Sequence, residues 1–201
     1  MLYIVASTGR AGSRAVAMFI FNALTKKAMP IVRNYDEFYQ HDGKIVKTHL
    51  HFKEELKCPY RAVYIYCNIG DCISSLARMS YGFLRFHLSN LEVREKHLNT
   101  FLRILRLPLH KKIRRFFAFY YIVKDDKLRF KENIASWHKA KHALFVKRED
   151  LVSDKEKISA QISARLDLPL GTFEPKERNW RKKDLPLLLR WLIDKTYPDF
   201  R

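Results

Sequence analysis

The chain has 201 residues, of which 47% are hydrophobic, and its 39 Lys and Arg exceed its 21 Asp and Glu to give a net charge of +18. This composition excludes a disordered, collagen-like or low-complexity chain, and the length predicts a single domain, residues 1–201, that buries a core. The charge favours an anionic partner such as a nucleotide, nucleic acid, an acidic glycan or a membrane face, without choosing among them.

The first elements are typical of a phosphate-binding strand, loop and helix. Residues 2–6 form a short apolar, β-prone run, and residues 15–24 are apolar nearly all round, as in a helix packed against a sheet. The loop between them contains Gly12, which lets the backbone approach a ligand, and Ser13, which adds a hydroxyl. A helix N-terminus offers free N–H groups and a positive dipole, and both favour phosphate. The Gly-Lys-Ser/Thr of nucleotide hydrolases is absent here, so ATP or GTP hydrolysis is disfavoured.

The later elements predict an α/β fold of three layers around a central parallel sheet of four to five strands. The run 61–67 is almost continuously apolar, which suits a strand buried on both faces of a parallel sheet. Further strands are expected at 44–49 and 143–147, and helices at 71–79, around 130–137, behind the capping box 153–156 as far as Leu166, and near 185–195.

A basic segment separates these units and predicts a helical insert near 82–130. Residues 96–124 contain no Asp or Glu, and a cluster of Phe and Tyr follows their central cations. The charge of the segment favours an anionic partner. Its basic residues are Lys96, Arg103, Arg106, Lys111, Lys112, Arg114, Arg115 and Lys124.

The cysteine count and the apolar runs predict a cytoplasmic protein. Three cysteines without metal-ligand spacing indicate a reducing compartment and no disulfide framework. No signal peptide is visible, and no apolar run approaches the roughly 20 residues of a membrane span. His49 and His51 lack further ligands at suitable spacing, so no metal site is expected.

The run Lys47-Thr48-His49-Leu50 follows the second predicted strand. Ligands of open α/β sheets bind at the carboxyl ends of strands, and a histidine there can act as a general base near neutral pH. Lys47 and His49 are two residues apart, so their side chains can share one face of the strand.

Four stretches, in the same order, resemble the sulfotransferases that use 3′-phosphoadenosine 5′-phosphosulfate (PAPS). The stretch 9–13 looks like the 5′-phosphosulfate loop of that family, and 46–50 looks like its Lys-Thr-His-Leu run. The stretch 62–76 is similar to the strand, loop and helix that grip the 3′-phosphate, and 132–169 is similar to the late strand and helix. The resemblance spans most of the chain.

The resemblance implies an enzyme that moves a sulfuryl group in line from PAPS to a hydroxyl or amine and leaves 3′,5′-adenosine bisphosphate (PAP), with no metal. The insert near 82–130 would then lie on the acceptor side, and its basic residues would favour an anionic acceptor, such as an acidic glycan or a lipid head group. It implies that His49 is the general base, that Lys47 holds the sulfuryl oxygens and that Arg10 neutralises the leaving phosphate. The implied nucleotide-binding residues are Gly9, Arg10, Ala11, Gly12, Ser13, Arg14 and Ser75.

The chain departs from the family pattern at the 3′-phosphate. Cys67 stands where the family usually has an arginine, and Arg148 stands where a tyrosine is common. Arg78, one helical turn beyond Ser75, is a candidate to compensate for the missing arginine. The late Arg-Lys-Gly loop of the family is replaced by the basic stretch 178–183, whose candidate nucleotide-binding residues are Trp180, Arg181 and Lys182.

Three other functions remain open from the sequence. Cys67 favours a nucleotide-binding pseudoenzyme or binding module on the same fold. A small-molecule kinase is disfavoured by the missing phosphate-loop lysine. A nucleic-acid-binding protein rests on net charge alone and predicts binding that falls steeply with salt.

Overall fold

The computed structural model describes residues 1–9, 11–24, 31–32, 37–38, 45–54, 56–175 and 181–200. The chain forms two compact units. The first unit comprises residues 1–67 and 132–177, and the second comprises residues 68–131 and 178–201.

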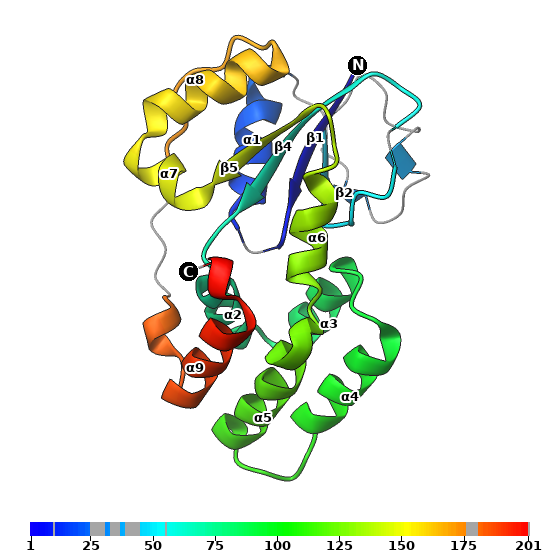
Figure 1. Cartoon of the computed structure of the whole chain (residues 1–201), viewed down its shortest axis with the longest axis vertical. Coiled ribbons are helices and arrows are strands. Elements are labelled where there is room, and N and C mark those ends of the chain that lie inside the picture. Colours follow the sequence, from blue (N-terminus) through cyan, green and yellow to red (C-terminus); the bar gives the residue numbers. More distant parts are fainter. Residues whose placement is uncertain are drawn as a thin grey trace. The chain divides into compact units, whose positions relative to one another are not determined.

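The first unit is built on a parallel sheet of five strands in the order β2-β3-β1-β4-β5 (Figure 1). The four longer strands match the four predicted ones, whereas the two-residue strand β2 was not predicted. Helix α1 packs on β1 and β3, and α8 packs on β4 and β5. The elements are β1 (Leu2–Ser7), α1 (Ser13–Leu24), β2 (Ile31–Val32), β3 (Ile45–Thr48), β4 (Tyr60–Tyr66), α6 (Phe130–Trp137, whose first two residues belong to the second unit), β5 (Ala143–Lys147), α7 (Arg148–Ser153) and α8 (Lys155–Leu166).

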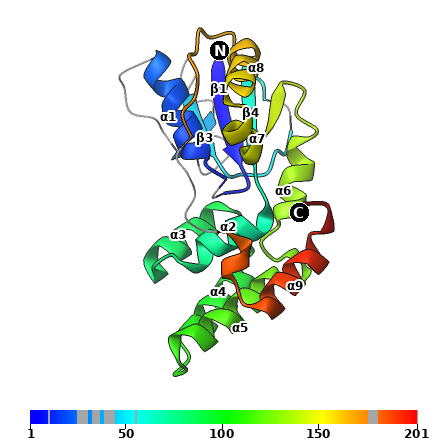
Figure 2. The same cartoon turned by 90° about the vertical axis from the view of Figure 1, so that its left-hand side faces the viewer.

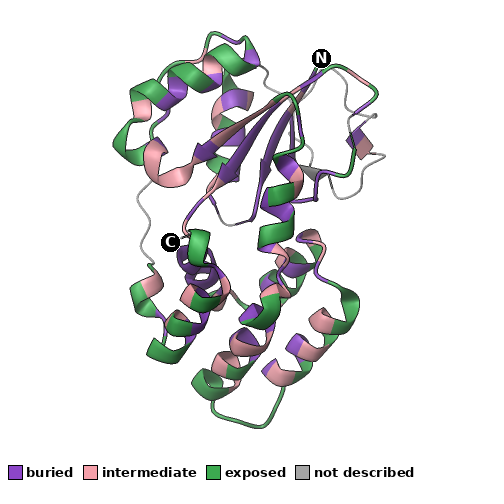
Figure 3. Cartoon of the chain, viewed as in Figure 1, coloured by how far each residue is buried: buried purple, intermediate pink, exposed green. Residues whose placement is uncertain are grey.

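The central strands β1 and β4 fill the middle of this sheet and are buried almost throughout (Figure 3). Because both faces of such strands are covered, their apolar residues run continuously instead of alternating with polar ones. The register pairs Ala6 of β1 with Thr48 of β3 and with Tyr64 of β4. The C-terminal ends of β1 and β3 therefore lie side by side, which places Ser7 next to His49.

The second unit is helical in its described parts, including the segment 82–130 expected to be a helical insert. Its helices α4 and α5 lie side by side in both views (Figure 2), with Phe101 against Phe119 at a ring-centroid distance of 5.4 Å. The elements are α2 (Ile69–Ala77), α3 (Tyr81–Asn90), α4 (Glu95–Leu105), α5 (Lys111–Val123), η2 (Lys124–Asp126), η3 (Lys182–Asp184), α9 (Leu187–Thr196) and η4 (Pro198–Phe200).

One cation of the predicted basic segment has a structural role. Arg115 of α5 donates to the backbone oxygens of Ala77 and Met79, the latter at 2.6 Å, just past the end of α2. A helix C-terminus has unpaired carbonyl groups and a negative dipole, and a guanidinium satisfies both. Arg115 therefore joins α5 to α2 rather than facing a ligand.

The cysteines differ from the expectation of a chain without disulfides. Cys67 and Cys72 are both disulfide-bonded, and Cys58 is a free cysteine. Their spacing gave no signal because disulfide partners are set by tertiary distance and not by a motif. The described helices include none with the length and apolar character needed to cross a membrane.

The partly buried Asp126 connects the ends of three elements in the second unit. Its carboxylate accepts hydrogen bonds from the Tyr197 hydroxyl at 2.7 Å and from the backbone N–H groups of Phe130 and Lys131, both at 2.9 Å. Burial raises the pKa of this carboxyl, although the bond from Tyr197 acts in the opposite direction. Since the folded pKa exceeds the unfolded one, this group favours folding in acid and opposes it once pH rises through the folded pKa.

Replacing Tyr197 by phenylalanine is expected to lower the free energy of unfolding by about 1–3 kcal/mol at neutral pH, because a hydrogen bond to an ionised, partly buried carboxylate is lost. The same loss raises the pKa of Asp126 further, so the destabilisation should shrink in acid, where the carboxyl is protonated. Urea unfolding at several pH values measures both effects. Tyr120→Phe on α5 is the matched control, and equal destabilisation at all pH values would contradict the assignment.

Candidate functional site

The loop between β1 and α1 has the backbone form expected of a phosphate-binding loop. Gly9 and Gly12 have φ values of 82° and 89°, in the left-handed region that favours glycine. Helix α1 begins at Ser13, and the N–H groups of Ala15 and Val16 already bond to the Gly12 oxygen. The earlier N–H groups at this helix end are therefore available to an anion.

The side chains of this loop differ in exposure and in bonding. Ala11 and Ser13 are buried, whereas Arg14 is exposed on the first turn of α1. The hydroxyl oxygen of Thr8 is buried and has no hydrogen-bond partner among the described residues. A buried polar atom of this kind at a loop marks a place where a ligand can supply the missing partner. Arg10, the expected catalytic cation, lies outside the described residues.

Arg148, the first residue of α7, covers the loop at Gly12. A Cβ atom added to Gly12 would lie 3.1 Å from Nε and 3.4 Å from Cδ of Arg148. This places a guanidinium stem against the phosphate-binding turn. The sequence showed Arg148 only as a departure from the family pattern, because no local motif links residue 148 to residue 12.

Replacing Gly12 by alanine is expected to weaken nucleotide binding by about tenfold or more. The left-handed backbone costs a non-glycine residue about 1–2 kcal/mol, and the new methyl group also displaces the Arg148 side chain. Calorimetry with PAP measures the loss. Gly171→Ala is the matched control, since a Cβ there meets nothing within 4 Å. If both variants bind PAP equally well, the loop assignment is wrong.

Lys47 and His49 form a buried, hydrogen-bonded pair at the end of β3, as their spacing predicted. Nζ of Lys47 lies 2.7 Å from Nε2 of His49, and the two residues are only 7% and 3% exposed. On the other side of the ring, Nδ1 of His49 lies 3.0 Å from Oγ and 3.1 Å from the backbone oxygen of Ser7. Both ring nitrogens are therefore engaged.

These contacts assign the protons of the histidine ring. The Lys47 ammonium only donates, so Nε2 of His49 accepts and Nδ1 carries the proton. That Nδ1–H group then donates to Ser7, whose own hydroxyl donates to Oγ of Ser13 at 2.9 Å and accepts from the N–H of Gly9 at 3.2 Å. Ser7 thus links the histidine directly to the glycine loop.

The backbone that carries His49 is held by side chains far away in the sequence. Nδ2 of Asn133 donates to the His49 oxygen at 3.0 Å, and Nε1 of Trp137 donates to the Leu50 oxygen at 2.9 Å. The hydroxyl of Tyr64 fixes Asn133 through its Oδ1 at 2.6 Å, and burial raises the pKa of Tyr64 well above its usual value. The strand end that carries His49 is therefore held in place by hydrogen bonds within the protein.

The remaining predicted residues that the structure describes, Ser75, Arg78, Arg181 and Lys182, lie in the second unit, in or around α2. The N–H of Lys182 donates to Asp71 at 2.7 Å, and Nη1 of Arg181 lies 3.6 Å from the same carboxylate. Arg78 pairs with Asp184 at 3.0 Å, and the N–H of Arg181 also donates to Asp184. The ammonium of Lys182 pairs with Asp194, so the cations Arg78, Arg181 and Lys182 each pair with a different carboxylate of the same unit.

Helix α2 contributes serines beside these cations. Ser74 and Ser75 follow Asp71 by three and four residues, the spacing of one helix face. Both are buried, and the Ser74 hydroxyl has no hydrogen-bond partner among the described residues. A Cβ on Gly70 would lie 2.5 Å from the Lys182 side chain, so η3 rests directly on the first turn of α2. Trp180 lies outside the described residues.

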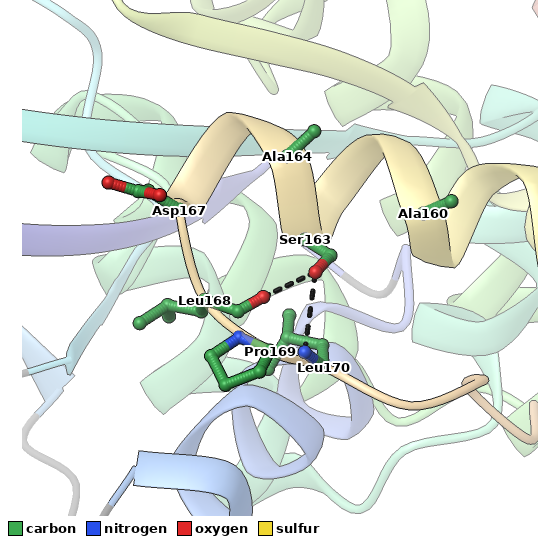
Figure 4. A pocket seen from close by; sticks show the side chains of 7 residues that line it. All are labelled: Ala160, Ser163, Ala164, Asp167, Leu168, Pro169 and Leu170. Atoms are coloured by element: carbon green, nitrogen blue, oxygen red, sulfur yellow. Dashed lines mark hydrogen bonds between the residues drawn. The ribbon is translucent and has the colours of Figure 1, made fainter.

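A pocket at the C-terminal end of α8 carries none of this chemistry (Figure 4). The Ser163 hydroxyl accepts from the N–H of Leu170 at 3.3 Å and donates to the Leu168 oxygen. Asp167 pairs with Arg61 at 3.2 Å. The pocket is lined by Ala160, Ser163, Ala164, Asp167, Leu168, Pro169 and Leu170. The lining contains no cation and none of the predicted site residues.

The structure of the chain is similar to that of mouse sulfotransferase SULT7A1, solved in complex with PAP, with a TM-score of 0.52 and 16% sequence identity. The fold is that of a sulfotransferase. The match covers 85% of this chain and 59% of the mouse chain. The chain therefore matches about three fifths of the length of the mouse protein. No family model matches the chain, and no curated protein matches its sequence.

Proposed function

We propose that the protein is a PAPS-dependent sulfotransferase that transfers a sulfuryl group to a hydroxyl or amine of an acceptor. The observation that carries the proposal is the buried Lys47–His49 pair, joined through Ser7 to a glycine loop on a sulfotransferase fold. A general base, a cation and a phosphate-binding turn are what in-line sulfuryl transfer needs, since its catalysis is mainly positioning and charge stabilisation.

The residues present suit the 5′ end of the nucleotide. The unpartnered Thr8 hydroxyl, the N-terminus of α1 and the left-handed Gly12 provide donors and close approach for a phosphate. We assign the 5′-phosphate to Gly9, Ala11, Gly12, Ser13 and Arg14, with Arg10 as the cation that neutralises the leaving phosphate. We also add Arg148 to this set because its stem lies on Gly12.

His49 accepts the acceptor proton at Nε2 in the proposed mechanism. PAPS, when bound, supplies the sulfuryl group and a stable phosphate leaving group. Lys47 then turns its ammonium from Nε2 of His49 to the sulfuryl oxygens, which frees the nitrogen lone pair for the acceptor hydroxyl. Ser7 keeps the proton on Nδ1 and stabilises the imidazolium that forms, as the third member of a catalytic triad does.

The bonds and charges balance in this scheme. The acceptor oxygen forms a bond to sulfur while the bond from sulfur to the phosphate oxygen breaks. The acceptor proton ends on Nε2 of His49, and the electron pair of the broken bond ends on PAP beside the positive side chains. No oxidant, reductant or metal takes part.

We assign the 3′-phosphate to the second unit, to Ser75 and the cations Arg78, Arg181 and Lys182, with Trp180 as the stacking partner of adenine. The gathering of these cations around α2 supports the assignment. They supply positive charge that the family places at the position of Cys67. The carboxylates of Asp71 and Asp184 would exchange their partners when phosphate binds.

The acceptor in this proposal is anionic, such as an acidic glycan or a lipid head group. The second unit supports this, because its 21 Lys and Arg exceed its eight Asp and Glu and account for +13 of the net charge of +18. A cationic surface attracts an anionic acceptor and raises its local concentration.

Calorimetry with PAP and with ATP tests the function. We expect PAP to bind and ATP to bind much more weakly, because PAP carries both a 5′-phosphate and a 3′-phosphate, for which we have assigned separate groups of residues. Preference for ATP, or binding of neither, would contradict the proposal. A protein that binds PAP but transfers no sulfuryl group to any acceptor would be the nucleotide-binding module that Cys67 favours.

A further inference from the structure

The connection between α4 and α5 forms an exposed tip with an unusual composition. Residues 106–113, called the tip below, are all exposed, although they join two well-packed helices (Figure 3). Leu107 and Leu109 are each 43% exposed and Ile113 is 47% exposed. Exposed aliphatic side chains that cluster at one end of a helical hairpin indicate an interaction surface.

The tip is also strongly basic. Arg106, Lys111 and Lys112 lie within it, and the whole surrounding segment 96–124 contains no carboxylate. Arg106 packs over the Tyr81 ring at 5.2 Å, whereas Lys111 and Lys112 are exposed at the first turn of α5. Apolar residues flanked by cations, without any acid, suit an anionic membrane surface, because the apolar side chains can insert and the cations can bind the anionic head groups.

The tip is an ordered structure. Its backbone N–H groups at Leu107, Leu109 and Ile113 bond to Ile104, Leu107 and His110 at 2.8–3.2 Å. The His110 side chain also accepts from the N–H of Lys112 at 3.4 Å. Because these three N–H groups are already bonded within the protein, entry of the leucines into the apolar boundary of a bilayer does not break their hydrogen bonds to water.

We propose that the tip docks the protein on anionic lipid bilayers, with Leu107, Leu109 and Ile113 inserted and Lys111 and Lys112 on the lipid phosphates. Nucleic acid would neutralise the cations but leave the aliphatic side chains in water, so the bilayer accounts for more of the surface. One turn further along α5, Phe117 is 50% exposed and extends the apolar edge. The proposal concerns attachment and not catalysis, so it does not depend on the proposed function.

Cosedimentation of the full chain with phosphatidylcholine vesicles, with and without phosphatidylserine, tests the docking. We expect binding to the anionic vesicles that falls as salt rises, and much weaker binding to the neutral ones. Each cation near an anionic surface is worth about fivefold in affinity, so Lys111→Ala with Lys112→Ala should weaken binding roughly 25-fold. The matched control is Lys139→Ala with Lys157→Ala, which removes two exposed lysines from the first unit.

A second variant separates insertion from plain attraction. Leu107→Ser with Leu109→Ser keeps every charge and is expected to weaken vesicle binding about tenfold, because apolar burial is lost. Circular dichroism confirms that each variant folds. Absence of binding to anionic vesicles, wild-type binding by either tip variant, or binding to DNA in preference to vesicles would overturn the proposal. His49→Ala should bind vesicles as the wild type does, which keeps this test independent of the catalytic site.

Discussion

Replacing His49 by alanine is expected to lower sulfuryl transfer by about 10²–10⁴-fold, the usual contribution of a positioned general base, while PAP binds as before. The binding is retained because the ring contacts Lys47 and Ser7, and the PAP phosphates are assigned to other residues. Rates with a phenolic or amine test acceptor, measured beside PAP calorimetry, show both effects.

The matched control for this variant is His142→Ala. His142 is an exposed histidine of the same unit, stacked edge-on against Tyr60 at 5.5 Å. Its loss should leave the transfer rate unchanged. A His49→Ala protein as active as the wild type would remove His49 from the mechanism, whatever the nucleotide affinity.

Replacing Lys47 by methionine is expected to lower the transfer rate by about 10²–10³-fold, because one preorganised charged donor is removed from the reacting oxygens. Methionine keeps much of the length and the apolar packing of the lysine stem in this buried position. The loss should fall on kcat and less on the KM for the nucleotide, since Lys47 is proposed to act on the group being transferred.

The matched control for this variant is Lys139→Met, an exposed lysine of the first unit. A double variant of Lys47 and His49 gives a sharper test, because two groups that act on the same proton and the same oxygens are not additive. The double variant should therefore be little slower than the slower single variant. Full multiplication of the two losses would mean that the 2.7 Å contact has no catalytic meaning.

Much of the sheet could be predicted from local pattern. Strands β1, β3, β4 and β5 are apolar runs long enough to stand out, and the almost continuous apolar run of β4 predicted a parallel sheet. Strand β2 has only two residues, which is too short for any periodicity to appear. Helix α7 was missed for a similar reason, since its six residues lie between a strand and the capping box.

Only part of the candidate site could be predicted from the sequence. Lys47 and His49 could be paired from sequence because alternate residues of a strand share a face. Ser7, Asn133 and Trp137 could not, because their contacts with this strand end depend on tertiary distance alone. The contact between Arg148 and Gly12 has the same character and requires the folded chain.

Around α2, carboxylates of this very basic protein neutralise its own cations. Arg78, Arg181 and Lys182 each have a carboxylate of the chain as their counterion, namely Asp184, Asp71 and Asp194. A phosphate that binds there displaces a fixed carboxylate instead of a mobile ion, so few small ions return to solution. At the tip, Lys111 and Lys112 lie in a segment without carboxylates and hold their counterions only as a diffuse cloud. For each cation contacted, an anion that binds at the tip therefore releases more small ions, and gains more entropy, than a phosphate that binds around α2.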